Sequence, residues 1–224
     1  CGYAERGEKE WKRLLGSFFA EGVNIAVVKN DEGQIEGYAV YRLGAPEIPV
    51  TEFVYTTRRA QRGLLNYFYN HRSQGESIRW NEGLHDTGYR FVPDGKTGHT
   101  TMPYMMARIV DVETALTTVP VNPEAVMMPI TLNIKGTDTV CDWNNGVFAL
   151  TLGESTLPNV KRVSTESVDE IDITIDIGGL TVLLMGAVSA KELVFEGKLQ
   201  GESHWIDYLD MVYPKQNTYI NEWW

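Results

Sequence analysis

The last residues of the chain, QNTYINEWW, end in two tryptophans, although chain ends are usually polar and frayed. Trp224 carries the terminal carboxylate, a group that can act as a general base where its surroundings raise its pKa. Alternation along an extended tail would place Glu222 and Trp224 on the same side. A structural interpretation stays open, in which Trp223 and Trp224 bury aromatic area in a groove and fix the last strand.

The remaining candidates for chemistry are few. The sequence contains no P-loop, GxGxxG, HExxH, CxxC pair or GxSxG pattern. Its histidines are too scattered for a metal-ligand signature; they are His71, His85, His99 and His204. We therefore expect no bound metal. The two cysteines, Cys1 and Cys141, do not suggest a disulfide framework and are typical of a cytosolic protein.

Composition narrows the classes of partner. Of the 224 residues, 43% are hydrophobic and 22% charged, which are ordinary globular values. The formal net charge of −10 argues against nucleic acid and is compatible with cationic ligands. The longest apolar run, Gly179 to Gly186, is far shorter than the ~20 residues of a membrane helix, so we expect no membrane span.

Apolar spacing predicts the elements that would position these residues. In the first half we expect a helix over 8–19, then a hairpin that turns at Asp31-Glu32-Gly33 and a strand over 49–56. A second helix is expected from 57 to about 74, with Thr57 as its N-cap. Short strands are expected at 78–80 and 102–110. Asp111 then caps a helix, and prolines in 117–126 mark a domain boundary.

The second half reads as a sheet with three short helices. Strands are expected over 128–136, 140–146 and 146–153, and over 168–177, where isoleucines alternate with polar residues. Asp176 and Ser189 cap the next two helices, Gly197 ends the second, and Pro214 ends a third over 204–213. The fold class is therefore α/β over residues 1–119, with a mixed sheet, followed by an α+β domain over residues 120–224.

Arg58, Arg59 and Arg62 precede Gly63 at a predicted strand-to-helix junction, where free N–H groups could bind a phosphate. The pyrophosphate loop of acetyltransferases has the form Q/R-x-x-G-x-G/A. Here Ala60 stands at the first position and Leu65 at the second small position. We interpret the segment as a solvated basic first turn and predict no cofactor-binding residue in this chain.

The stretch PYMMARIVDVETAL resembles the segment that closes the central domain of Eis-type (enhanced intracellular survival) GNAT N-acetyltransferases, which are bacterial enzymes. The later stretches DEIDITIDI, GGLTVLLMG, SAKELVFEG and WIDYLDMVYP, followed by an aromatic tail, look like the sterol-carrier-protein-type domain of the same family. The resemblance covers about residues 8–224. The order and spacing of these stretches are specific when they are taken together, although no single motif is specific by itself.

The resemblance implies that residues 1–119 are the central GNAT-like domain, which lacks a working acetyl-CoA loop and whose start could be truncated. Residues 120–224 would be the sterol-carrier-protein-like domain with a buried C-terminal tail. The chain would be the C-terminal portion of an acetyl-CoA-dependent N-acetyltransferase. Acetyl-CoA would bind to a missing upstream GNAT domain of the same polypeptide, so this chain alone would be inactive.

The resemblance also assigns the tail. The carboxylate of Trp224 would be the general base that deprotonates the substrate amine, and Glu222 and Trp223 would contact the substrate. Family members often have an acidic residue immediately before the last, where this chain has Trp223. Substrates would be cationic amines, such as aminoglycosides, polyamines or lysine. A homo-oligomer in the cytoplasm is expected, with secretion a weaker analogy.

Two alternatives remain. One is a non-catalytic module that binds lipid or another small ligand in an apolar tunnel of the sterol-carrier type. Its lining would come from Leu180, Leu183, Leu184 and Trp205. Core packing explains the same residues more simply. The other alternative is a purely structural or oligomerising fragment.

Overall fold

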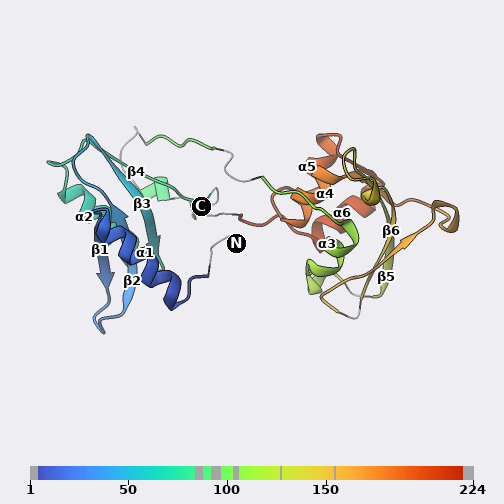
Figure 1. The fold of residues 1–224 in the computed structure, drawn as a ribbon, viewed down its shortest axis with the longest axis horizontal. Helices are drawn as coiled ribbons and strands as arrows, with labels where there is room; N and C mark the ends of the chain where they lie inside the picture. The colour runs from blue at the N-terminus through green and yellow to red at the C-terminus, as the bar shows by residue number, and fades with distance from the viewer. Residues whose placement is uncertain are drawn as a thin grey trace. The chain divides into compact units, whose positions relative to one another are not determined.

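The computed structural model describes residues 5–83, 88–91, 97–102, 106–126, 128–153 and 155–218. Two compact units, each with its own sheet, divide these residues between 95 and 96 (Figure 1). Both sheets contain parallel and antiparallel pairs, so the predicted mixed α/β architecture is confirmed.

The first unit places its strands in sequence order, β1-β2-β3-β4. The first three strands are antiparallel, and β4 runs parallel to β3. Helix α2 lies between β3 and β4 and supplies the crossover that a parallel pair needs. The elements are α1 (Glu8–Ala20), β1 (Asn24–Lys29), β2 (Ile35–Tyr41), β3 (Glu47–Tyr55), α2 (Arg58–Asn70), β4 (Ser77–Trp80) and the 3-10 helix η1 (Gly88–Phe91).

Helices α1 and α2 lie on opposite faces of the sheet of the first unit. Leu64 and Phe68 of α2 belong to one core cluster with Ala39 of β2. Trp11 of α1 meets Tyr38 edge to face, with ring centroids 6.0 Å apart. Since neighbouring residues of a strand point to opposite faces, Ala39 and Tyr38 assign α2 and α1 to different faces.

A buried charged cluster ties the segment before α1 to strand β3. The side chain of Glu52 is 6% exposed and lies 2.9 Å from the guanidinium of Arg6. Arg6 Nη1 also donates to Glu52 Oε2 at 3.0 Å, and the Tyr38 hydroxyl donates to the same oxygen at 2.5 Å. A buried carboxylate is stable only when its charge is paired in this way.

The second unit has the strand order β7-β6-β5-β8-β9, in which only the β5–β8 pair is parallel. Its elements are α3 (Val112–Thr118), η2 (Pro123–Ala125), β5 (Ile130–Thr137), η3 (Asp142–Asn144), β6 (Gly146–Leu152), β7 (Asn159–Val163), η4 (Thr165–Ser167), β8 (Ile173–Asp176), α4 (Ile177–Leu184), α5 (Ala190–Phe195), β9 (Leu199–Gly201) and α6 (Ser203–Val212).

Helices α3 to α6 gather on one side of β5 and β6 (Figure 1). One hydrophobic core takes residues from every strand and α-helix of this unit, among them Leu116, Phe148 and Leu193. The core reaches back to α3, whose Val112 and Leu116 are almost fully buried in it. The domain boundary predicted between residues 119 and 120 stays a prediction. Helix α3, which precedes that boundary in the sequence, packs in the core of the second unit.

Most predicted elements are present, and three expectations are wrong. Residues 106–110, the described end of the strand predicted over 102–110, form no strand. The segment 140–146 contains the 3-10 turn η3 instead of a strand. The strand predicted over 168–177 is formed only at Ile173–Asp176. No helix in the described part of the chain is both long and apolar enough to cross a bilayer.

Candidate functional site

The predicted site residues Glu222, Trp223 and Trp224 lie outside the described residues, which end at Thr218. The structure does describe where the tail begins, in the second unit. The terminal carboxylate can act only within reach of this starting point. The position of the starting point therefore limits any chemistry of the tail.

Helix α6 ends just before the tail. Pro214 cannot continue a helix, and the backbone N–H of Tyr213 closes the last turn on the carbonyl of Leu209 at 2.8 Å. Asn122 satisfies two further carbonyls: its backbone N–H donates to Val212 at 3.0 Å, and its side chain donates to Met211 at 3.2 Å. The helix end is therefore fixed to the segment that follows α3.

Two contacts then hold the first residues of the tail. The backbone N–H of Gln216 donates to the carbonyl of Gly186 at 2.8 Å. Lys215 Nζ lies 2.7 and 3.0 Å from the two carboxylate oxygens of Glu192. Glu192 also accepts a hydrogen bond from the backbone N–H of Ser189 at 2.7 Å, within the predicted capping box. Lys215, together with Ser189, lowers the pKa of Glu192 to about 2, so the ion pair persists at neutral and mildly acidic pH.

Tyr213, at the same place, is 5% exposed, and its hydroxyl has no hydrogen-bond partner among the described residues. Burial raises the pKa of this phenol, which keeps it protonated. Its ring belongs to the core cluster of the second unit, so it holds the start of the tail against that core.

In the first unit, the β3–α2 junction is the strand-to-helix junction at which the pyrophosphate loop of an acetyltransferase would lie. Thr57 caps α2 as predicted, because its hydroxyl oxygen accepts from the backbone N–H of Ala60 at 3.1 Å. The same hydroxyl donates to Glu36 Oε2 at 3.0 Å, and Arg59 donates twice to that oxygen, at 3.1 and 2.8 Å. The predicted solvated basic turn is therefore partly neutralised by Glu36.

This junction does not fit the pyrophosphate of acetyl-CoA. An anion at a helix N-terminus needs free backbone N–H groups and a positive local field. Here Thr57 takes the N–H of Ala60, and the carboxylate of Glu36 lies within hydrogen-bonding distance of that cap. The helix is also pressed close to the sheet, since a Cβ added at Gly37 would come within 3.1 Å of the Ala60 side chain.

The described histidines take part in local contacts. His71 Nδ1 lies 2.8 Å from the carbonyl of Tyr67, and His204 Nδ1 lies 3.3 Å from Glu202. His85 is outside the described residues. Among residues that the structure describes, no group of three or more His, Cys, Asp or Glu side chains could hold a metal ion.

The proposed lining of a lipid tunnel lies in the core of the second unit. Leu180 and Leu183 are 3% and 1% exposed and pack within the main cluster, and Leu184 and Trp205 pack against it, partly buried. These contacts are those of ordinary core residues.

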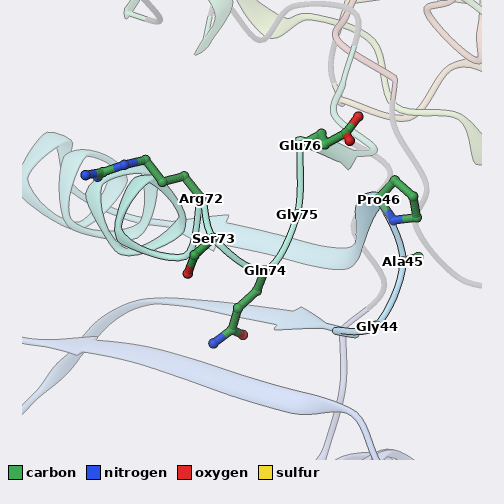
Figure 2. Close-up of a pocket in the computed structure, with 8 residues that line it drawn as sticks. All are labelled: Gly44, Ala45, Pro46, Arg72, Ser73, Gln74, Gly75 and Glu76. Atoms are coloured by element: carbon green, nitrogen blue, oxygen red, sulfur yellow. The ribbon is translucent and has the colours of Figure 1, made fainter.

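One solvent-open hollow lies in the first unit, between the β2–β3 loop and the residues after α2 (Figure 2). It is open to solvent, has a volume of about 370 Å³ and is lined by Gly44, Ala45, Pro46, Arg72, Ser73, Gln74, Gly75 and Glu76. Figure 2 shows the side chains of Arg72, Gln74 and Glu76 pointing in different directions, so they do not converge on a common ligand.

Comparison with known families assigns both halves of the chain. Residues 2–109 match the acetyltransferase (GNAT) domain, and residues 112–221 match the sterol carrier protein domain. The chain therefore consists of a GNAT domain followed by a sterol-carrier-protein-like domain. It matches no curated protein sequence.

Several solved structures are similar to nearly the whole of this chain but have low sequence identity to it. A conserved protein of unknown function from Enterococcus faecalis V583, described as a probable N-acyltransferase, is 26% identical with a TM-score of 0.78, over 90% of this chain and 50% of its own. A GCN5-related N-acetyltransferase from Anabaena variabilis ATCC 29413 is 18% identical with a TM-score of 0.77, over 100% and 56%. Eis1 from Mycobacterium abscessus is 19% identical with a TM-score of 0.65, over 97% and 55%.

The similarities to the Anabaena variabilis and Mycobacterium abscessus structures show a shared fold alone. The chain spans about half the length of these solved structures.

One expectation from the sequence needs correction. Residues 1–119 were expected to be only GNAT-like, with the acetyl-CoA-binding GNAT domain missing from the chain, whereas residues 2–109 match the acetyltransferase (GNAT) domain itself. Acetyl-CoA is the cofactor of the GNAT family, and the residues of the β3–α2 junction do not fit its pyrophosphate.

Two contacts were missed from the sequence. The partners Glu36 and Arg59 are 23 residues apart, and so are Glu192 and Lys215. Both pairs join different elements, so no helical or strand periodicity signals them. The only local signal was the Ser189–Glu192 capping box, which predicted the helix start but not the contact with the tail.

Proposed function

We propose that this chain is part of an acetyl-CoA-dependent N-acetyltransferase that acts on cationic amines. The observation that carries the proposal is the order of the two domains, GNAT then sterol carrier protein, matched over residues 2–221. The description of the E. faecalis structure as a probable N-acyltransferase supports the same reaction class. Because the chain spans about half the length of the structures that it matches, the activity is proposed for the complete gene product.

Acetyl-CoA supplies the activated acetyl group when it is bound. The residues of this chain are proposed to handle the acceptor. An amine that is protonated at neutral pH must lose a proton before it can attack a carbonyl, so a base at the amine is required. We assign this role to the terminal carboxylate of Trp224, with Glu222 and Trp223 contacting the amine.

The acceptor class rests on charge. A formal net charge of −10 favours the approach of cationic molecules, such as polyamines, aminoglycosides or lysine side chains. Assembly into a homo-oligomer and a cytoplasmic location remain predictions. The described core contacts of Leu180 and Leu183 give the lipid-binding alternative no separate support.

The test is acetyl transfer by the complete gene product, with spermidine, an aminoglycoside and a lysine peptide as acceptors. Deletion of Trp224 moves the terminal carboxylate back by one residue, and we expect kcat to fall on the order of 100-fold or more. Trp224→Ala is the matched control, because it keeps a carboxylate at the same chain position and removes only the indole. It should retain most of kcat.

A deletion variant with the kcat of the wild-type protein would exclude the terminal carboxylate as the base. A complete gene product that transfers no acetyl group to any amine would overturn the proposed reaction class. Far-UV circular dichroism of both variants establishes that the fold is intact.

A further inference from the structure

The start of the tail is held by contacts from two neighbouring turns of the second unit. The backbone N–H of Gln216 reaches the carbonyl of Gly186, the residue that follows the C-cap of α4. The ammonium of Lys215 reaches the carboxylate of Glu192 in the first turn of α5. One contact is made by the backbone and the other by a side chain, so together they restrain both position and direction.

Gly186 is required for the backbone contact. Its φ of +68° is the left-handed conformation that ends a helix and that favours glycine. A Cβ added there would lie 3.1 Å from both Cβ and Cγ of Gln216 and 3.3 Å from its backbone nitrogen. Any larger residue would therefore push against the tail at the point where the hydrogen bond forms.

Gly197 provides a natural comparison within the same unit. It follows the C-cap of α5 and has a φ of +73°. Its backbone N–H donates to the carbonyl three residues earlier, as that of Gly186 does, and at both places the N–H of the next residue donates to the carbonyl five residues before it. In the described part of the chain, a Cβ added at Gly197 would meet nothing within 4 Å. Substitution at either glycine imposes the same backbone strain, but only the one at Gly186 disturbs the tail.

Glu192 is prepared for its contact with Lys215. Its carboxylate is already oriented by the backbone N–H of Ser189, and the backbone N–H of Ala190 is satisfied separately by Asp210 at 2.5 Å. Lys191, the neighbouring cation, is paired with Asp207 and does not compete for Glu192. The acid of the capping box therefore faces one cation from the tail.

We propose that Gly186, Glu192 and Lys215 act as a tail clamp, whose function is to position the terminal carboxylate for the reaction. The inference rests on the proposed function of Trp224. Eight residues follow Gln216, so the carboxylate can lie at most about 28 Å from the clamp. Releasing the clamp removes the fixed starting point and direction of the tail, which lowers the effective concentration of the base at its target. The three clamp members are positioning residues.

The experiment compares Gly186→Ala with Gly197→Ala in the complete gene product. Backbone amide hydrogen exchange of Gln216 reports on the clamp directly and does not depend on activity. We expect exchange at Gln216 to be at least tenfold faster in Gly186→Ala than in Gly197→Ala. We expect kcat to fall about tenfold in Gly186→Ala only, with KM for acetyl-CoA unchanged.

Lys215→Met and Lys215→Arg complete the test. Methionine removes the charge and should lower kcat, whereas arginine can keep the pair with Glu192 and should restore it. Equal exchange at Gln216 in the two glycine variants would overturn the clamp. Faster exchange in Gly186→Ala with an unchanged kcat would overturn its positioning role.

Failure of the proposed function is separable from failure of the clamp. If deletion of Trp224 leaves kcat unchanged, the terminal base is excluded, and with it the catalytic purpose of the clamp. The exchange at Gln216 in the two glycine variants would still establish whether Gly186 holds the start of the tail.

Discussion

The carboxylate of Asp138 shapes the loop between β5 and β6. Its side chain is fully buried, and Arg108 Nη2 lies 2.7 Å from each of its oxygens. It also accepts hydrogen bonds from the side chain of Asn144 at 2.9 Å and from the backbone N–H groups of Val140 and Cys141 at 2.9 and 3.1 Å. These contacts turn the chain into η3 where a strand was predicted.

Asp138→Asn should therefore destabilise the second unit. The amide keeps the size of the side chain but removes the charge that pairs with Arg108, and it cannot accept as many hydrogen bonds. We expect a lowering of Tm on the order of 10 °C, measured by circular dichroism. Asp142→Asn, at an exposed position of the same loop, is the control and should change Tm little. Equal Tm values for both variants would contradict the role of Asp138.

The same residue predicts a pH dependence. The hydrogen bond from Asn144, supported by backbone N–H groups and by Arg108, holds the pKa of Asp138 well below its usual range. Because the folded state lowers this pKa, the ionised carboxylate stabilises the fold above the unfolded value of about 4, and this stabilisation is lost as the pH falls further. The Tm difference between wild type and Asp138→Asn should be constant from pH 7 to pH 5 and shrink below pH 4. A difference as large at pH 3 as at pH 7 would count against this account.

Helix caps are the element-scale features that the sequence predicted best. Thr57, Asp111, Asp176 and Ser189 each accept a hydrogen bond from a backbone N–H three residues later. The information for such a contact lies within one turn of chain, so residue type and spacing are sufficient to predict it. The ends at Gly197 and Pro214 are local in the same sense, and both were predicted.

We expect Asp176→Ala to cost about 1 kcal/mol of unfolding free energy, because the backbone N–H of Gly179 loses its partner at the start of α4. Urea denaturation measures this loss. Glu202→Ala is the matched variant: Glu202 is the N-cap of α6, but its side chain makes no capping hydrogen bond. If both substitutions cost the same, the capping hydrogen bond is not what stabilises α4.

The errors at this scale have non-local causes. Strands β7 and β9 were missed, since each is short and defined by its neighbour in the sheet. Strand β8 begins late because the carboxylate of Asp172 accepts from the backbone N–H of Asn133 at 2.7 Å and so takes the place of a strand contact. The candidate site divides in the same way: its helix starts were predicted, but the pairs that join distant elements were not.

The placement of α3 connects these contacts to the whole molecule. Residues 108–112 are attached to the second unit by Arg108, by Ile109, whose N–H donates to Thr181, and by Val112, whose N–H donates to Asn144. The family matches change from the GNAT domain to the sterol carrier protein domain between residues 109 and 112. Contacts and family matches thus place α3 with the second core, ahead of the proline-containing connector from which the sequence boundary was predicted.

Two fragments of the second unit distinguish a domain that includes α3 from one that begins at residue 120. Residues 106–224 retain the whole core cluster, since all its members lie between Ile109 and Tyr213. This fragment should unfold cooperatively and give a dispersed amide NMR spectrum. Residues 120–224 lack Val112 and Leu116, which are 1% and 0% exposed. Truncating core residues of this kind costs about 2–4 kcal/mol each, against a typical total of about 5–15 kcal/mol, so the shorter fragment should be unstable or unfolded. If it unfolds as cooperatively and at the same urea concentration as the longer one, α3 is dispensable, and the domain begins at residue 120 as the sequence predicted.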